Sequence, residues 1–188
     1  MSIQPAGTKL EYTVTYLEMT HHPRYPWPVM PVGFPGNLVR AERPPDWYFL
    51  SLYDAVGRDY AWEDMHSEPP GAVADWLADP KTSLWTLLAH GWPQGFFVID
   101  AREAGRSDLS YFGLVPEAVG KGVGRFLLQT AILTGWSEEG TEKVTVNTCT
   151  LDHPRALGLY QWAGFDPVRR ETLTRVLTRP RDLSRIPD

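Results

Sequence analysis

The middle of the sequence holds three β-type segments that are separated by two very short turns. The segments span residues 84–90, 95–101 and 108–115, and the turns read Gly91-Trp92-Pro93 and Glu103-Ala104-Gly105-Arg106. A connection this short can join only antiparallel neighbours, because a parallel crossover needs a dozen or more residues. The chain is therefore predicted to contain an antiparallel sheet.

Further strands and helices surround these three segments. Alternating and β-branched residues predict strands, whereas helical spacing, capping residues and a proline in a first turn predict helices. The expected strands are residues 9–20, 143–150 and 167–177, and the expected helices are residues 47–59, 70–77, 123–136 and 154–163. We expect an α/β (α+β) fold in which a mixed, mostly antiparallel twisted sheet of about six to seven strands is flanked by about four helices.

The length of 188 residues is typical of one domain, so residues 1–188 are expected to fold together. Residues 21–46 carry seven prolines. Proline fixes its own φ and lacks a backbone donor, so this stretch is expected to be an irregular insert. Residues 180–188 are polar and are expected to form a mobile tail.

Composition excludes several classes of protein. Hydrophobic residues make up 43% of the chain and charged residues 22%, which argues against disorder. No apolar stretch is long enough to span a bilayer, and no secretory signal is visible, so we expect a cytoplasmic protein. Cys149 is the only cysteine, and the five histidines form no convincing ligand set, so no metal site is expected. The net charge of −5 argues against nucleic acid as a partner.

An alternating glycine loop lies between a predicted strand and a predicted helix. It reads Val119-Gly120-Lys121-Gly122-Val123-Gly124-Arg125. The glycines remove side chains where the chain turns, so backbone N–H groups can converge on an anion at the helix N-terminus. The helix dipole favours negative charge there, and Lys121 and Arg125 add positive charge. A pyrophosphate is the natural ligand of such a loop.

The spacing of the glycines argues against two other phosphate-binding loops. The dinucleotide fingerprint requires a third glycine where this chain has Leu127 or Arg125. A Walker loop requires Ser or Thr after the lysine, and this chain has Gly122 after Lys121. A nucleotide-binding α/β protein is therefore disfavoured, and a glycine-rich turn without a ligand stays the alternative for the loop alone.

A second motif follows, because residues 152–165 read DHPRALGLYQWAGF. With the strand 111–115 and the glycine loop, this motif resembles the GNAT superfamily of acyl-CoA-dependent N-acyltransferases. Gly122 and Gly124 match the glycines of the family loop, and the family helix is matched by Ala156, Leu159, Tyr160, Gly164 and Phe165. The resemblance is best over residues 83–177. Two positions differ, since Val119 replaces the family's arginine or glutamine and His153 replaces its asparagine.

The resemblance implies an N-acetyltransferase that moves an acetyl group from acetyl-CoA to a primary amine, by direct attack through a tetrahedral intermediate. It implies acetyl-CoA as co-substrate, no metal, and a monomer or a homodimer. The residues expected to bind the coenzyme are Leu114, Val115, Val119, Gly120, Lys121, Gly122, Val123, Gly124, Arg125, Asn147, His153 and Tyr160. Cys149 is expected to be a buried small hydrophobe rather than a nucleophile.

The resemblance also implies where the chemistry takes place. The last strand before the glycine loop is expected to splay from the next strand, with a bulge at Gly113, so that its free backbone pairs with the pantetheine arm. The N–H of Leu114 or Val115 would then donate to the oxyanion. Tyr160 matches the tyrosine that protonates the departing thiolate. Asp108 is a candidate base, and a chain of waters without a dedicated base is the alternative.

The acceptor is expected to lie against the first two helices. Residues 46–79 hold eight acidic residues and one basic residue, Arg58, so a negative rim would attract a cationic amine. The aromatic residues that could contact the acceptor are Trp27, Trp47, Tyr48, Tyr60 and Trp62. A non-catalytic acyl-CoA sensor or interaction module stays an alternative function because of Val119, His153 and the unassigned base.

Overall fold

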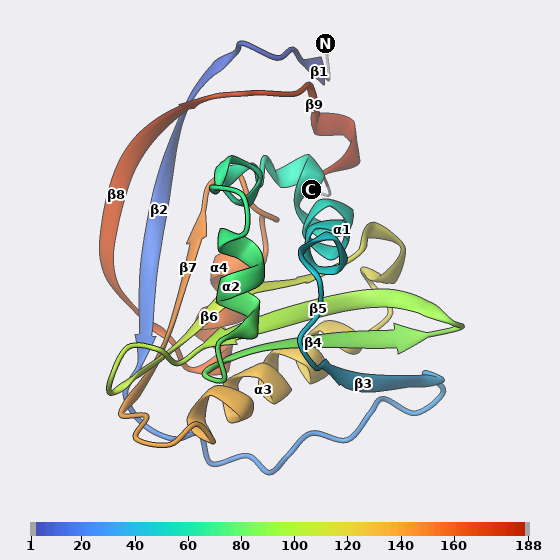
Figure 1. Ribbon diagram of the computed structural model, residues 1–188, viewed down its shortest axis with the longest axis vertical. Helices are drawn as coiled ribbons and strands as arrows, with labels where there is room; N and C mark the ends of the chain where they lie inside the picture. The colour runs from blue at the N-terminus through green and yellow to red at the C-terminus, as the bar shows by residue number, and fades with distance from the viewer. Residues whose placement is uncertain (1–2, 187–188) are drawn as a thin grey trace.

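The computed structural model describes residues 3–186 and contains a seven-stranded sheet in the order β3-β4-β5-β6-β7-β2-β8 (Figure 1). Only β6 and β7 are parallel, and every other neighbouring pair in this sheet is antiparallel. The predicted mixed and mostly antiparallel sheet is therefore confirmed. The strands are β2 (Lys9–Met19), β3 (Gly36–Ala41), β4 (Thr82–Ala89), β5 (Trp92–Asp100), β6 (Arg106–Leu114), β7 (Lys143–Cys149) and β8 (Asp166–Val176).

Four α-helices flank the sheet, which agrees with the expected number among the described residues. They are α1 (Asp46–Gly57), α2 (Ala72–Ala78), α3 (Val123–Trp136) and α4 (Ala156–Ala163). A second sheet pairs β1 (Ile3–Gln4) with β9 (Arg181–Asp182). Four 3₁₀ turns complete the described chain: η1 (Arg58–Tyr60), η2 (Asp64–Ser67), η3 (Pro116–Ala118) and η4 (Leu183–Arg185). Within residues 3–186 no helix has the length and hydrophobicity needed to cross a membrane.

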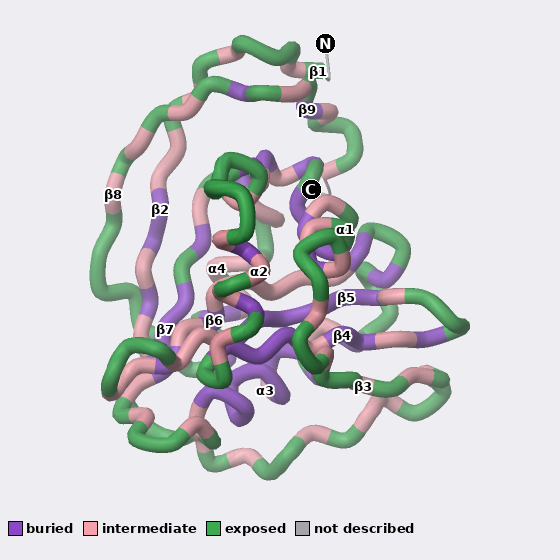
Figure 2. The backbone as a smooth tube through the Cα atoms, viewed as in Figure 1, coloured by how far each residue is buried: buried purple, intermediate pink, exposed green. Residues whose placement is uncertain are grey.

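The helices cover both faces of the sheet. Successive residues of a strand point to opposite faces, and the fully buried neighbours Phe96 and Phe97 on β5 belong to two different hydrophobic clusters. Phe96 packs with residues of α1 and α2, whereas Phe97 packs with residues of α3 and α4. The strand β5 is buried along most of its length, as Figure 2 shows, so it forms the centre of a three-layer arrangement.

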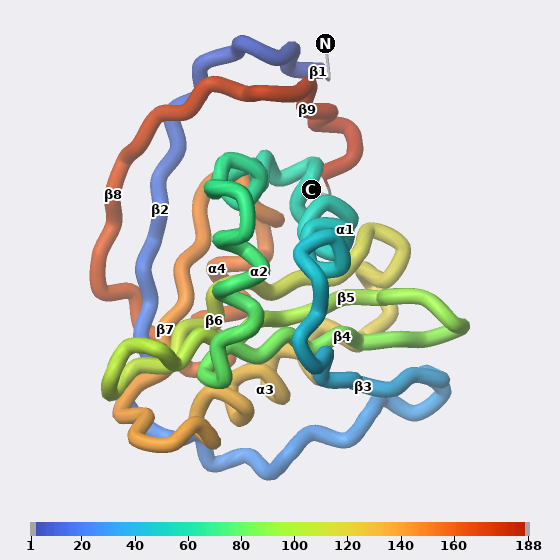
Figure 3. Tube along the Cα trace, in the orientation of Figure 1, coloured from blue at the N-terminus to red at the C-terminus, as the bar shows by residue number. Residues whose placement is uncertain are grey.

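The N-terminal strand lies among C-terminal strands. β2 pairs antiparallel with β7 on one side, where Val14 faces Cys149, and with β8 on the other, where Lys9 faces Val176. In Figure 3 the blue N-terminal segment runs between the orange and the red segments of the chain. Residues that are more than a hundred positions apart in the sequence therefore close this half of the sheet.

The structure corrects three expectations from the sequence. The proline-rich segment 21–46 is not irregular throughout, because it contains the edge strand β3. Trp92 and Pro93 belong to β5 rather than to the preceding turn. The tail is structured up to residue 186, since β9 pairs with β1 and Arg181 is buried, where its guanidinium donates to the carbonyl oxygens of Asp59 and Leu151. The last two residues of the expected tail lie outside the described part.

Gly113 supports close packing of α1 on β6 rather than a bulge. The register between β5 and β6 shifts after Val98, which leaves Ser110 as the extra residue of the bulge. A Cβ atom at Gly113 would lie 2.3 Å from Cγ1 of Val56 on α1. The absence of a side chain at this position therefore lets the helix approach the strand.

Gly113→Ala is expected to destabilise the fold by about 1–3 kcal/mol, because the added methyl group overpacks the contact with Val56. Thermal or urea unfolding measures the change. The double variant Gly113→Ala with Val56→Ala should recover part of the loss. Gly158→Ala is the matched control: this position lies inside α4 with no atom within 4 Å of an added Cβ. It should stabilise the protein by about 1 kcal/mol. A neutral Gly113→Ala variant would contradict the contact.

Candidate active site

The parallel strands β6 and β7 separate after a short paired stretch. Arg106, Ser107 and Asp108 pair with Lys143, Val144 and Thr145, and no pairing follows between the rest of β6 and β7. The backbone of β6 from Leu109 to Leu114 therefore borders an open wedge on its β7 side. The strand β5 still pairs with this part of β6 as far as Leu114, so the sheet opens only between β6 and β7.

The hydrogen-bond pattern of β6 decides which of its amides faces the wedge. The Val115 N–H donates to the carbonyl oxygen of Gln94 at 3.0 Å, so Val115 is directed toward β5. Hydrogen-bonded and non-hydrogen-bonded pairs alternate along an antiparallel ladder, and Leu114 faces Gly95 in the next pair. The Leu114 N–H therefore points away from β5 and into the wedge. Of the two amides considered from the sequence, Leu114 is the one that is free to donate.

The glycine loop connects β6 to α3 and leaves several amides without partners. Gly120 and Gly122 have φ of +81° and +78°, and Gly122 is the N-cap of α3. The Val119 N–H donates to Pro116 and the Lys121 N–H donates to Ala118, so these two amides are already used inside the loop. Within residues 3–186, no hydrogen bond outside the helix is donated by the amides of Gly120, Gly122, Val123 and Gly124.

The loop and the helix N-terminus lie beside the end of the wedge. A Cβ atom at Gly124 would be 3.5 Å from Cδ1 of Leu114, so the first turn of α3 packs directly on the end of β6. The side chain of Arg125 extends over the ring of Trp162 on α4, 4.5 Å from its centroid. The free amides, the helix dipole and Arg125 are groups that can attract an anion to this position.

Tyr160 on α4 lies next to the unpaired part of β6. Its ring contacts Phe112 edge to face, with the centroids 6.1 Å apart, and also contacts Phe165. The side chain is 6% exposed, and its hydroxyl makes no hydrogen bond to any residue in the described range 3–186. Burial, together with the nearby charge of Asp152, raises the pKa of the Tyr160 phenol above its ordinary value. The phenol is therefore protonated at neutral pH and its proton is available.

His153 precedes α4 and can act as a hydrogen-bond donor. Its Nδ1 accepts the backbone N–H of Arg155 at 3.1 Å. Burial and the charge of Arg155 lower the pKa of the His153 imidazole. The neutral ring whose Nδ1 is an acceptor carries its proton on Nε2, so Nε2 can donate. Asn147 is exposed on β7, beyond the part of that strand that pairs with β6.

Asp108 lies at the closed end of the wedge, and both of its carboxylate oxygens already accept hydrogen bonds. The Thr145 hydroxyl donates to Oδ1 at 2.5 Å and the Ser110 hydroxyl donates to Oδ2 at 2.9 Å. The contact with Thr145 joins β6 to β7 at the last paired residue, whereas Ser110 lies on β6 itself. Asp108 therefore holds the two strands together where they diverge, and any exchange of a proton with an amine would need a water molecule in between.

The five aromatic residues expected at the acceptor side do not gather in one place. Trp47 and Tyr48 line a pocket along α1, whereas Trp27 is exposed in the proline-rich segment. Tyr60 contacts His153, with the ring centroids 6.2 Å apart. The indole N–H of Trp62 donates to Asp152 at 3.0 Å. Tyr60 and Trp62 therefore fasten the segment after α1 to the segment that leads into α4.

The negative rim expected for residues 46–79 is partly neutralised by contacts inside the protein. Six of its eight carboxylates are engaged. Asp54 contacts Arg179 and His66, and Asp59 contacts Arg185. Glu63 accepts from the Thr178 N–H, Asp64 accepts from the hydroxyls of Tyr53 and Tyr111, and Asp46 and Asp79 accept from the nearby N–H groups of Trp47 and Lys81. Three of these partners come from residues 178–185, and one of them, Arg185, lies within the stretch 180–188 that was expected to be a mobile tail. The field of this wall is therefore weaker than the charge count suggests.

Sequence reasoning missed one residue that organises the site. Oδ2 of Asp152 accepts the Thr148 hydroxyl and the Cys149 N–H, both at 2.8 Å, while Oδ1 accepts the Trp62 N–H. Asp152 therefore fixes the end of β7 close to Tyr160. An aspartate that follows a strand and precedes a proline-bearing turn is typical of such a bond to the local backbone, and that signal was available. Burial raises the pKa of the neighbouring Cys149 thiol to about 11, which argues against a nucleophilic thiolate.

Comparison with known protein families identifies the fold. The model of the acetyltransferase (GNAT) family matches residues 48–165, which is more than half of the chain. The chain belongs to the GNAT family. The matched range includes most of α1 and all of the β6–β7 wedge, the glycine loop and α4, so the family assignment rests on largely the same residues as the candidate site. Family and fold together support an acyltransferase enzyme.

Solved GNAT structures share this fold at low sequence identity. A GCN5-related N-acetyltransferase from Sphaerobacter thermophilus is 18% identical, with a TM-score of 0.54 over 96% of this chain and 54% of that one. A tandem GNAT protein from the clavulanic acid biosynthesis pathway is 14% identical, with a TM-score of 0.58 over 88% of this chain and 53% of that one. This chain thus spans only about half of those two proteins.

An aminoglycoside acetyltransferase from an uncultured soil metagenomic sample is closer in length. It is 16% identical, with a TM-score of 0.54 over 69% of this chain and 87% of that one. No curated protein sequence matched this chain. The structural similarities establish the fold, whereas the acyl donor and the acceptor have to be argued from the site itself.

Proposed function

We propose that this chain is an N-acetyltransferase that moves an acetyl group from acetyl-CoA to a primary amine. The observation that carries this proposal is the wedge between β6 and β7, with free amides at its end and the hydroxyl of Tyr160 beside it. Acyl transfer from a thioester requires an anchor for the coenzyme, a donor for the carbonyl oxygen and a proton for the leaving sulfur. The residues around the wedge can supply all three.

Each group has a separate role in the proposed reaction. Acetyl-CoA supplies an activated acyl group and a thiolate leaving group. The amides of Gly120, Gly122, Val123 and Gly124 bind its diphosphate, and the Leu114 N–H donates to the carbonyl oxygen as negative charge develops there. The amine nitrogen forms a bond to the carbonyl carbon and loses a proton to the general base. The carbon–sulfur bond breaks, and the Tyr160 hydroxyl gives its proton to the sulfur. His153 can donate from Nε2 to the pantetheine arm.

The general base is either Asp108, acting through a bridging water, or a chain of waters without a dedicated side chain. The two hydroxyl donors on Asp108 favour the second alternative. Asp108→Asn is therefore expected to lower stability by about 1–2 kcal/mol, because it disturbs two partly buried hydrogen bonds. The pH–rate profile should keep its position. A profile that loses or shifts its acidic limb in Asp108→Asn would instead identify Asp108 as the base.

Ligand-dependent thermal unfolding tests the proposal directly. Acetyl-CoA should raise the melting temperature, because a ligand that binds only the folded state adds about 3 kcal/mol to the free energy of unfolding at about 100 times its Kd. NAD and ATP should not raise it, because they are not expected to bind. Release of free thiol in the presence of a panel of primary amines then measures turnover. Absence of an acetyl-CoA shift would contradict the proposal. Binding without turnover on any amine would favour the sensor, which the exposed Val119 in place of a phosphate-binding side chain also suggests.

A further inference from the structure

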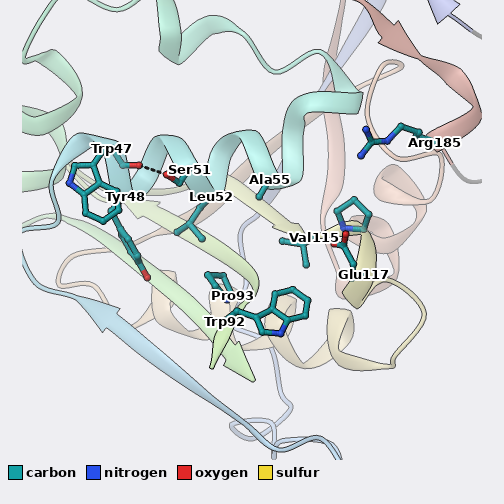
Figure 4. A pocket seen from close by; sticks show the side chains of 11 residues that line it. Trp47, Tyr48, Ser51, Leu52, Ala55, Trp92, Pro93, Val115, Glu117 and Arg185 are labelled. Carbon is teal, nitrogen blue, oxygen red and sulfur yellow. Dashed lines mark hydrogen bonds between the residues drawn. The ribbon is translucent and has the colours of Figure 1, made fainter. Parts of the chain in front are cut away.

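A pocket with aromatic walls lies along α1, next to the turn that follows β6. Its volume is about 560 Å³, which is in the range of small-molecule sites. Figure 4 shows that Leu52, Pro93 and Val115 border this space between the helix and β5. Leu52 and Val115 are almost fully buried, so the base of the pocket is apolar. The pocket lies on the α1 side of β6, whereas the wedge opens on the β7 side.

Two tryptophans at the pocket are unusually exposed. Trp47 at the start of α1 is 63% exposed, and Trp92 at the start of β5 is 40% exposed. Tyr48 follows Trp47 on α1, stands edge to face with it, and donates from its hydroxyl to Thr86 at 3.0 Å. The three rings therefore present apolar surface that no described residue covers. Such walls accommodate a flat apolar group and also favour a cation.

The charges at the other end of the pocket select a cationic ligand. Arg185 is neutralised, because its Nε lies 3.1 Å from Oδ2 of Asp59. Glu117 has no ion pair and no hydrogen bond to any residue between 3 and 186, so its charge is uncompensated. The pocket therefore carries a net negative charge at the end formed by η3. A carboxylate or phosphate ligand would be repelled there, and an ammonium group would be attracted.

We propose that this pocket binds the acceptor, and that the acceptor is a primary alkylamine carrying a flat apolar ring. The ring lies against Trp47 and Trp92, and the acceptor binds with its ammonium group beside Glu117. The nitrogen then gives up a proton to the general base before it attacks the thioester. Glu117 and Val115 follow Leu114 within three residues, so the charged end of the pocket adjoins the end of the strand whose amide faces the thioester. This inference rests on the proposed acetyl transfer, and it narrows the acceptor from any primary amine to one class.

Binding of three small probes tests the inference without turnover. 4-Phenylbutylamine has both the ring and the ammonium group, 4-phenylbutyrate replaces the cation by an anion, and n-butylamine lacks the ring. Binding is measured by saturation-transfer NMR and by thermal unfolding, each with and without acetyl-CoA. 4-Phenylbutylamine should bind at least about tenfold more tightly than either of the other two probes, since its ring and its charge each contribute to the affinity. Equal or tighter binding of n-butylamine or 4-phenylbutyrate would overturn the inference.

Variants locate the binding. Glu117→Gln and Trp92→Ala should each weaken the binding of 4-phenylbutylamine at least about fivefold. The matched controls Glu139→Gln, which removes the same charge elsewhere, and Trp27→Ala, which removes another exposed ring, should not. If Trp92→Ala fails to fold, Trp47→Ala replaces it. The acetyl-CoA shift of the Trp92→Ala variant should equal that of the native chain.

Two results separate this inference from the proposed function. If the native chain binds acetyl-CoA and acetylates ring-free amines in preference to 4-phenylbutylamine, the proposed function holds and the pocket assignment is wrong. If 4-phenylbutylamine binds with the expected sensitivity to Glu117 and Trp92 but acetyl-CoA does not bind, the pocket is a cation site and the acetyltransferase proposal fails.

Discussion

Replacing Tyr160 by phenylalanine is expected to lower turnover about a hundredfold and to leave the affinity for acetyl-CoA unchanged. The phenyl ring keeps the contacts with Phe112 and Phe165, and the hydroxyl makes no hydrogen bond that the variant would lose. Stability should therefore be unaffected. The only group removed is the proton donor for the thiolate.

The direction of the pKa shift explains why this tyrosine suits the role. Burial raises the pKa of the Tyr160 phenol, so the proton is present across the neutral range. The same apolar surroundings disfavour a free thiolate, whose ordinary pKa is about 8.5, and so they favour transfer of the proton to sulfur. A raised pKa alone would make the Tyr160 phenol a weaker acid, but burial also raises the proton affinity of the thiolate that receives the proton.

Steady-state kinetics and equilibrium binding measure the two effects separately. The variant should have a lower kcat for a responsive amine, with the Kd for acetyl-CoA unchanged. Tyr16→Phe is the matched control, because it also removes a phenol hydroxyl, one that donates to Glu171 on β8. If Tyr160→Phe and Tyr16→Phe turn over equally fast, Tyr160 is a packing residue and the thiolate leaves without it.

Local sequence signals were sufficient to predict the elements whose ends are marked by neighbouring residues, such as glycines or short turns. The helix predicted for residues 123–136 has the same bounds as α3, because glycines precede it and helical spacing of apolar residues continues to Trp136. The hairpins between β4, β5 and β6 also followed from turn length alone. The glycine loop and the α4 motif were recognisable because their spacing is local.

Features that depend on distant partners could not be read from the sequence. Nothing near Val14 indicates that β2 will lie between β7 and β8, since its partners are more than a hundred residues away. The edge strand β3 was missed because prolines surround it and only β4 provides hydrogen bonds for it. In the sequence Arg181 belongs to a polar tail, yet the carbonyl oxygens that accept hydrogen bonds from its guanidinium come from two distant segments.

The same distinction applies within the site. Residue types and spacing identified Tyr160 and the glycine loop, but the choice between Leu114 and Val115 needed the register with β5. The acidic residues of 46–79 could be counted from the sequence, whereas their neutralisation by Arg179 and Arg185 depends on how the C-terminal segment returns to α1. Nothing in the local sequence marks Glu117, because the rings that line the same pocket come from α1 and β5 and are placed beside it only by the fold.

Gly122→Ala is expected to weaken acetyl-CoA binding at least about tenfold, which corresponds to about 1.4 kcal/mol. Gly122 is the N-cap of α3 and has φ of +78°, a conformation that favours glycine. A side chain there adds strain and places a methyl group where the diphosphate has to approach the amides. No protein atom lies within 4 Å of the added Cβ, so the effect on binding does not come from a clash inside the protein.

Gly140→Ala separates strain from ligand contact. Gly140 has the same φ of +78° and the same open surroundings, but it lies in the turn between α3 and β7, away from the wedge. Both variants should lose a similar amount of stability, about 1–2 kcal/mol, because each forces a Cβ into the left-handed region. Isothermal titration with acetyl-CoA should then show a weakened Kd for Gly122→Ala only. Equal affinities in the two variants would mean that the coenzyme is not held by the amides at the start of α3, and the anion site would have to be sought elsewhere on the wedge.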